Sequence, residues 1–170
     1  MKTSYITLPN SLLDMKLTAN ELAVLFYISS IYSGKKQVRV RQAVIARRCG
    51  IKTTQTVSRI TASLAMKGLL EQRRCIYSAN DSGIMFYTVC LPSADNGYFK
   101  VSRHILDEGL TPQQMRLYLF ICRSVSSKLG YCWNSYNDLA KLIGMKRSDV
   151  ITLMTQLHRK NVIRKQLVKS

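Results

Sequence analysis

Acidic residues are scarce in this chain of 170 residues. It has 9 Asp and Glu against 26 Lys and Arg, so its formal net charge is +17. Because like charges repel in a compact molecule, such an excess seldom serves folding and favours a polyanionic partner, either nucleic acid or an anionic membrane surface. Residues 1–92 hold 13 basic and 4 acidic residues, and residues 93–170 hold 13 and 5. This even split predicts two similar basic modules rather than one core with a basic arm.

Other features are missing, and each absence excludes a class of protein. No apolar run approaches the roughly 20 residues of a membrane-spanning helix, and the N-terminus lacks the apolar segment of a signal peptide. The five cysteines form no Cys-x-x-Cys pair and there are two histidines, which predicts reduced thiols in a cytoplasm and no metal site. No phosphate-binding Gly-x-x-x-x-Gly-Lys loop and no carboxylate cluster for a two-metal nuclease is present. We therefore expect no enzyme, no catalytic residue, no cofactor and no membrane partner.

A weak internal repeat is the most informative feature that is present. The matching positions are Leu13-Asp14 and Leu106-Asp107, Leu17-Thr18 and Leu110-Thr111, Ala46 and Ala140, Gly50 and Gly144, Val57 and Val150, Ile60 and Leu153, and Leu64 and Leu157. One supersecondary unit is therefore used twice. Because residues 92–97 are small, polar and contain proline and glycine, we predict domains at 1–92 and 98–170, joined by a linker at 93–97.

Each unit is predicted to contain three helices. They are expected at 19–32, 41–49 and 54–67, and again at 112–127, 136–143 and 147–160. Thr18 with Glu21, and Thr111 with Gln114, have the spacing of a capping box at the start of the first helix. Strands are expected at 70–76 and 85–91, with a turn-rich segment between them. In the second unit Val162-Ile163 matches Leu69-Leu70, and one candidate strand follows the third helix, so its hairpin is predicted to be short or truncated. The predicted fold class is mainly α with small β-hairpins (α+β).

The third helix of each unit belongs to a predicted helix-turn-helix. Gly144 supplies the positive φ of a tight turn between two helices. Val150, Leu153 and Leu157 bury one helix face, so the opposite face carries Ser148, Thr152 and Thr155, which are short enough to enter a major groove. The first half has one extra residue in its turn, and there the outward positions are Gln55, Ser58, Arg59 and Ala62.

The sequence also resembles a known family. From Phe99-Lys100-Val101 to Leu139-Ala140, and above all at Cys132-Trp133-Asn134-Ser135-Tyr136, it is similar to winged-helix domains of bacterial mobile-element DNA-binding proteins. These include plasmid replication initiators and phage replisome organisers. The resemblance implies two tandem winged-helix domains, each with a β-hairpin wing, that bind DNA in association with a bacterial nucleoid or plasmid. Lys146 departs from the pattern, because a small N-capping residue is usual there.

The predicted DNA-binding residues lie around the two helix-turn-helix motifs and on the first wing. They are Lys52, Thr53, Thr54, Gln55, Thr56, Ser58 and Arg59, with Arg41, Arg73 and Arg74, in the first half, and Lys146, Arg147, Ser148 and Thr152 in the second.

Several of these residues have a plainer interpretation. Lys52, Lys146 and Arg147 near helix N-termini oppose the helix dipole, so fold stability alone would not select them. Arg59 is either a reader of bases or phosphates or a solvated charge, and we favour the reader. For Arg73 and Arg74, an exposed basic strand edge that limits aggregation is equally good.

Basic residues outside this set, and two aromatic residues, also have alternative roles. Arg39, Arg47 and Arg48 are as well explained by a solvated face as by phosphate contacts. Trp133 and Tyr136 are expected to pack in the core rather than to stack on bases.

The predicted function is sequence-specific binding of double-stranded DNA, in replication initiation or transcriptional control. The alternative is a replisome or conjugation accessory protein whose winged helices mainly dock partner proteins. The charge of both halves favours DNA contact in either case. A membrane surface is disfavoured because the basic residues are spread over several short elements. The expected state is a monomer with a pseudo-twofold repeat or a homodimer.

Overall fold

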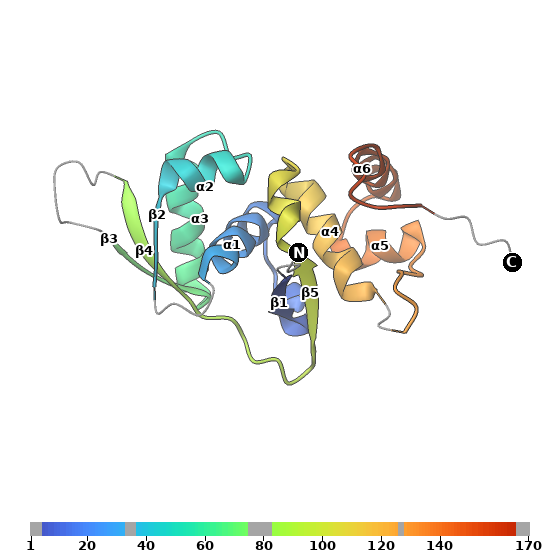
Figure 1. Cartoon of the computed structure of the whole chain (residues 1–170), viewed down its shortest axis with the longest axis horizontal. Helices are drawn as coiled ribbons and strands as arrows, with labels where there is room; N and C mark the ends of the chain where they lie inside the picture. Colours follow the sequence, from blue (N-terminus) through green and yellow to red (C-terminus); the bar gives the residue numbers. More distant parts are fainter. Residues whose placement is uncertain (1–4, 33–36, 75–82, 126–127, 166–170) are drawn as a thin grey trace, which may run out of the picture.

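The computed structural model describes residues 5–32, 37–74, 83–125 and 128–165. The elements of the first half are β1 (Tyr5–Pro9), the 3-10 helix η1 (Asn10–Asp14), α1 (Ala19–Tyr32), β2 (Val38–Arg41), α2 (Gln42–Arg48), α3 (Thr54–Met66), β3 (Leu70–Arg74) and β4 (Ile84–Val89). Those of the second half are β5 (Tyr98–Ser102), the 3-10 helix η3 (Arg103–Asp107), α4 (Pro112–Ser124), α5 (Tyr136–Ile143) and α6 (Arg147–Arg159). The helices dominate and the sheets are small and antiparallel, which is the predicted α+β class (Figure 1).

Local capping signals determine where the first helix of each half begins. The Thr111 hydroxyl accepts a hydrogen bond from the Gln114 N–H (3.3 Å), and the Gln114 side chain accepts one from the Thr111 N–H (3.0 Å). Thr18 and Glu21 make the same pair of bonds, at 3.2 and 2.7 Å. Both predicted capping boxes are confirmed. Helix α1 is buried along the whole of 22–28, as its continuous apolarity indicates.

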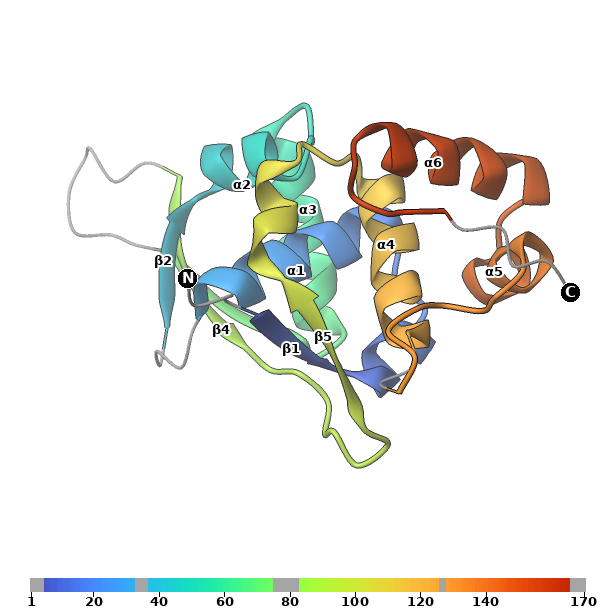
Figure 2. The same ribbon diagram turned by 45° about the vertical axis from the view of Figure 1, so that its right-hand side comes forward.

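A three-stranded antiparallel sheet with strand order β2-β4-β3 closes the first half. Figures 1 and 2 show it at the end of the molecule farthest from α5 and α6. Strands β3 and β4 were predicted, although the proposed extension of β3 to 76 lies outside the described residues. Strand β2 was missed: residue 41 was assigned to a helix, whereas α2 begins at Gln42. The period of two in Val38-Arg39-Val40-Arg41, with both valines buried, is the signal that identifies β2.

The second half has no strand at Val162 and Ile163, the positions that match Leu69 and Leu70 in the repeat. Asn161 has a left-handed backbone (φ 58°), and the Val162 N–H donates to the Leu157 carbonyl oxygen at 3.0 Å. These residues therefore finish the C-terminal turn of α6. Residues 160–165 contain no strand, and 166–170 lie outside the described part of the chain.

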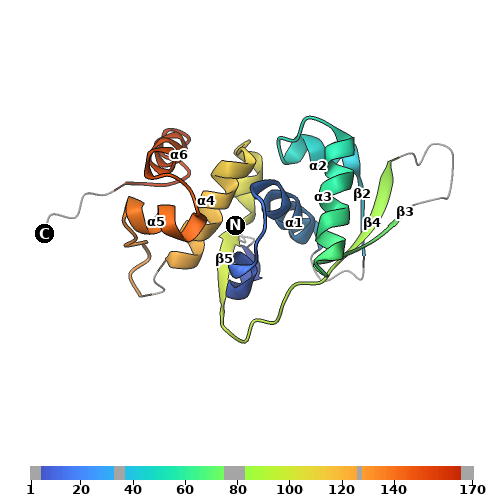
Figure 3. The same ribbon diagram turned by 180° about the vertical axis from the view of Figure 1, so that it is seen from behind.

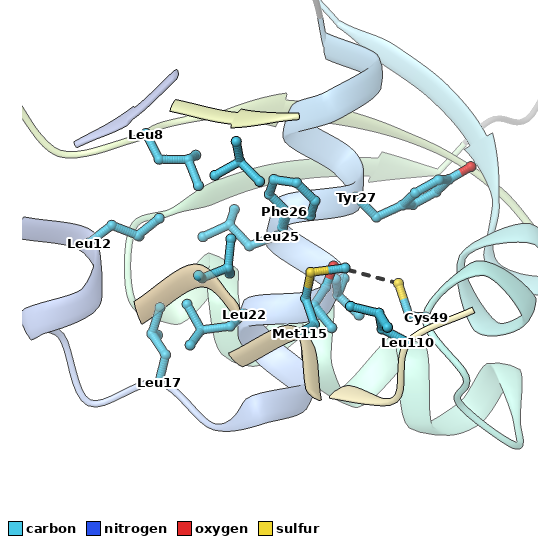
Figure 4. Close-up of a cluster of buried hydrophobic side chains, with 14 of the residues drawn as sticks. Leu8, Leu12, Leu17, Leu22, Leu25, Phe26, Tyr27, Cys49, Leu110 and Met115 are labelled. Carbon is cyan, nitrogen blue, oxygen red and sulfur yellow. Dashed lines mark hydrogen bonds between the residues drawn. The ribbon is translucent and has the colours of Figure 1, made fainter. Parts of the chain in front are cut away.

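The two halves pack closely against each other. Strand β1 pairs antiparallel with β5, and α1 packs against α4. Figure 3 shows β5 between the helices of the first half and those of the second. One cluster of buried side chains includes Leu8, Leu22 and Cys49 from the first half with Leu110 and Met115 from the second (Figure 4). Strand pairing thus crosses the predicted linker at 93–97, and the division into domains stays a prediction.

Candidate nucleic-acid interface

A left-handed glycine sets the turn between α2 and α3. Gly50 has φ 65°, and the Ile51 N–H donates to the Ala46 carbonyl oxygen at 2.8 Å. Thr53 then caps α3, because its hydroxyl accepts a bond from the Thr56 N–H (3.2 Å). This is the N-cap expected from the sequence, and it places Thr54 at the first position of the helix.

The turn between α5 and α6 is built in the same way. Gly144 has φ 70°, and the Met145 N–H donates to the Ala140 carbonyl oxygen at 3.0 Å. Lys146 occupies the N-cap position without a side-chain capping bond. Asp149 in the first turn suits the positive end of the helix dipole. Both halves therefore contain two helices joined by a glycine turn, with a third helix behind them.

Helix α3 presents most of the predicted residues to solvent. Val57, Ile60 and Leu64 are buried, whereas Lys52, Thr53, Thr54, Gln55, Ser58 and Arg59 are exposed. Thr56 is half-buried, and its hydroxyl is hydrogen-bonded to that of Thr53 (2.8 Å). Within the described residues Gln55 and Arg59 have no hydrogen-bond or ion-pair partner. Their polar groups are therefore available to a ligand.

Helix α6 presents a polar face on which two hydroxyl groups already donate to backbone oxygens. Lys146, Arg147, Ser148 and Thr152 are exposed, as predicted. The Thr152 hydroxyl donates its proton to the Ser148 carbonyl oxygen (3.0 Å), so it remains available only as an acceptor. The predicted outward residue Thr155 is half-buried, donates to the Ile151 carbonyl oxygen and accepts a bond from Lys165 (3.3 Å). Its hydroxyl is therefore less accessible than the sequence indicated.

A buried carboxylate attaches the C-terminal end of α3 to the start of α1. Glu21 is 4% exposed. It accepts hydrogen bonds from the Ser63 hydroxyl (2.6 Å) and from Lys67 Nζ (2.7 and 2.8 Å). Burial opposes ionisation of Glu21, but the bonds from Lys67, Ser63 and the Thr18 N–H outweigh it and lower the pKa of the carboxyl. We call Glu21, Ser63 and Lys67 the Glu21 cluster.

The second half holds α6 through residues at the equivalent positions. Gln114 Nε2 donates to Gln156 Oε1 (2.8 Å). Lys160 Nζ donates to the Glu108 and Gly109 carbonyl oxygens at 2.9 and 3.3 Å. Lys67 likewise donates to a carbonyl oxygen, that of Lys16, at 3.2 Å. The second half therefore uses neutral amides where the first half uses a charged pair.

The sheet of the first half gathers arginines on its outer face. In the strand register Arg39 lies opposite Phe86, and Phe86 opposite Arg73. The Arg73 guanidinium lies over the Phe86 ring, 5.3 Å from its centroid. Arg41 is two residues from Arg39 and is exposed on the same face. Three arginines are thus brought together on this face.

The sheet places the predicted residue Arg74 away from these arginines, and the packing of the halves gives Arg48, which is outside the predicted set, a partner. Arg74 is exposed, but strand alternation places it on the opposite face from Arg73. Arg48 forms an ion pair with Asp107 of the second half (3.1 Å), which gives it a structural role that its sequence position did not reveal.

The tryptophan is exposed, contrary to expectation. Trp133 is 56% exposed, and its ring contacts that of Tyr131, with 4.8 Å between centroids. It lies on the connection between α4 and α5. Tyr136, in contrast, is half-buried and packs against the core, as expected. The segment Tyr131-Cys132-Trp133 is too short for its sequence pattern to predict which of its side chains are buried.

The described residues hold no group of three or more His, Cys, Asp or Glu side chains that could bind a metal ion. Among the helices described here, none has the length and apolarity to cross a bilayer.

Comparison with known proteins bears on the second half. Among curated proteins, none matches the sequence. A family model described as a helix-turn-helix domain matches residues 108–163. The matched range contains α4, α5 and α6, including the Gly144 turn and the exposed face of α6. Residues 108–163 are therefore similar to a helix-turn-helix domain, a similarity that supports DNA binding.

Proposed function

We propose that this chain is a non-enzymatic protein that binds specific sequences of double-stranded DNA through two tandem winged-helix units, at 1–92 and 98–170. The observation that carries the proposal is the exposed polar face of α3, which follows a left-handed glycine, as α6 does in the matched helix-turn-helix domain. Short polar and basic side chains on such a helix suit the major groove. The net charge of +17 suits the phosphate backbone.

Individual residues have different roles in this proposal. Gln55 and Arg59 lie on one exposed face of α3 without a partner among the described residues, so they read base edges. Ser58, Thr53, Thr54 and Thr56 line the same helix start. Lys52 stands before the N-cap and contacts phosphate. On the wing, Arg73 and Arg41 share the outer face of the sheet and contact the phosphate backbone of the DNA, whereas Arg74 lies on the opposite face of the sheet.

The first half contributes more to affinity than the second. It has the three-stranded sheet with its arginines, whereas the second has no strand after α6 among the residues described. In the second half Lys146 and Arg147 contact phosphate, and Ser148 and Thr152 face the major groove. Asp149 lies beside them, and its carboxylate repels the phosphate groups. Substitution of Lys146 and Arg147 by alanine should therefore weaken binding less than substitution of Lys52 and Arg73.

A selected duplex tests the proposal. DNA bound by the full chain is enriched from a random library, and affinity is then measured by fluorescence anisotropy at several salt concentrations. Each neutralised phosphate contributes about −0.9 to the slope of log K against log salt, and two basic units are expected to neutralise about 6–10 phosphates. Affinity that hardly changes with salt contradicts the proposal.

Three single substitutions test whether the exposed face of α3 contacts DNA. Arg59→Ala and Gln55→Ala should reduce discrimination between selected and random DNA, for Arg59 by about 1–3 kcal/mol at one base pair. Lys52→Ala should weaken both DNAs equally. Lys128→Ala, exposed on the connection between α4 and α5, is the matched control and should change neither. Equal losses on both DNAs for the three substitutions place the interface on another face.

The process served is proposed from the resemblance alone: replication initiation or transcriptional control by a plasmid- or phage-type protein in the bacterial cytoplasm, at a nucleoid or plasmid. A docking role for replication or conjugation proteins is the second candidate. It is favoured by one observation, the exposed apolar side chains of Leu129, Tyr131 and Trp133 beside α5. Trp133→Ala should leave DNA affinity unchanged if this surface serves another protein.

A further inference from the structure

The strand pairing at the centre of the molecule relates the two halves by a local twofold axis. Strands β1 and β5 are equivalent in the repeat, because Tyr5 and Tyr98 begin them 93 positions apart. They pair antiparallel, so that Tyr5 lies opposite Ser102 and Pro9 opposite Tyr98. Thr7 lies opposite Lys100, the residue 93 positions later, which is its own equivalent. An element that pairs antiparallel with its own copy, centred on one equivalent pair, indicates a twofold relation and not a translation.

Side-chain contacts between the halves follow the same symmetry. The Arg123 guanidinium donates to the Asn10 carbonyl oxygen (3.2 Å), and the Arg103 guanidinium donates to the Ser30 carbonyl oxygen. Asn10 and Arg103 are equivalent at 93 positions apart, and so are Ser30 and Arg123. The same pair of positions therefore meets twice with the halves exchanged. This is the property of an isologous interface.

The axis also exchanges the two exposed helices. Helices α3 and α6 begin at Thr54 and Arg147, which are 93 positions apart, and both have 13 residues. Both end in a left-handed residue at equivalent positions, Gly68 (φ 72°) and Asn161 (φ 58°). Because Glu21 and Gln114 anchor these helices from equivalent positions, the two helices keep the same place within their halves.

We infer that one chain binds a duplex site made of two half-sites in inverted orientation that differ in sequence. This inference rests on the proposed function. A duplex has local twofold axes perpendicular to its own axis, so two units related by a twofold fit inverted half-sites, as symmetric dimers fit palindromes. Units related by translation would fit direct repeats instead.

The half-sites differ because the outward residues differ. At equivalent positions α3 and α6 carry Gln55 and Ser148, Ser58 and Ile151, Arg59 and Thr152, and Ala62 and Thr155. A guanidinium and an amide read bases through bidentate hydrogen bonds, which serine and threonine do not form. The site is therefore inverted in geometry but not palindromic in sequence.

Two symmetrised variants of the full chain test this. In the first, Ser148→Gln, Ile151→Ser, Thr152→Arg and Thr155→Ala give α6 the outward face of α3. In the second, Gln55→Ser, Ser58→Ile, Arg59→Thr and Ala62→Thr make the reverse change. Each folded variant, checked by circular dichroism, is used to select duplexes from a random library, and the bound complex is weighed by sedimentation equilibrium.

We expect a palindrome from each variant, the first built from the α3 half-site and the second from the α6 half-site, with the wild-type spacing and one chain bound. The first variant should bind its palindrome about tenfold or more tightly than the wild type does, since a single mismatched base pair costs that much. Either variant suffices if the other does not fold. Direct repeats, a lone half-site or two chains on one site overturn the inference while leaving the proposed function intact. Failure of the wild type to enrich any duplex overturns the proposed function itself.

Discussion

Replacement of Glu21 by glutamine tests whether a buried charge anchors α3. The carboxylate receives bonds from Ser63, Lys67 and the Thr18 N–H. Glutamine keeps one acceptor oxygen, which can still cap Thr18, as Gln114 caps Thr111 in the second half at 3.0 Å. Its amide can also donate to the Ser63 hydroxyl. The interaction that disappears is the charged pair with Lys67.

The expected loss follows from the surroundings of the two groups. A hydrogen bond to a charged group contributes about 1.5–3 kcal/mol to stability. The side chain of Lys67 is 34% exposed and retains its bond to the Lys16 carbonyl oxygen, so its charge stays partly solvated. We therefore expect Glu21→Gln to lower the free energy of unfolding by an amount near the lower end of that range.

The loss depends on pH in a defined direction. Folding lowers the pKa of Glu21, so the charged form stabilises the fold. This contribution is complete above the unfolded pKa of a glutamic acid and disappears as pH falls through the lower folded pKa. The variant lacks the titrating group. Its difference from the wild type should therefore be largest near neutral pH and should shrink in acid.

Urea unfolding at pH 7 and at several acidic pH values measures this difference in the free energy of unfolding. The contributions of the other carboxylates cancel in the difference, because both proteins contain them. Asp14→Asn is the matched control, since its ion pair with Arg123 (2.6 Å) involves a carboxylate that is 68% exposed. It should change the free energy of unfolding by less than about 1 kcal/mol. A Glu21→Gln difference that is the same in acid and at pH 7 would refute the argument, and so would a variant as stable as the wild type.

Three further predictions follow from single positions. Gly144→Ala should destabilise the protein by about 1–2 kcal/mol, because its φ of 70° strains an L-residue even though nothing lies within 4 Å of the added Cβ; unchanged urea unfolding would contradict the left-handed turn. Burial raises the pKa of Cys49 to about 12 and that of Cys122 to about 11, so iodoacetamide at pH 8 should modify both only in unfolded protein, as peptide mass mapping can check. Trp133, the single tryptophan, should emit as a solvated indole and be quenched by acrylamide in the folded state. Fluorescence that acrylamide does not quench would show that Trp133 is buried.

Features that depend on neighbouring residues were predictable from the sequence. The Thr111–Gln114 box and the Gly144 turn are set within a few residues, because capping and positive φ are local demands. The period of Val57, Ile60 and Leu64 likewise identifies the exposed face of α3, since a buried stripe leaves the opposite side to solvent. The repeat itself is visible in the spacing of apolar residues.

Only the tertiary structure decided how the halves meet and which side chains are covered. The pairing of Thr7 with Lys100 joins segments far apart in sequence, and nothing local in either strand specifies its partner. Trp133 is exposed, a fact that its apolarity could not reveal. Arg48 forms its ion pair with Asp107 because the packing of the two halves brings these distant residues together. Local patterns carry the period and ends of each element, whereas contacts between distant segments depend on the whole arrangement of the chain, and the twofold relation of the two halves belongs to the second kind.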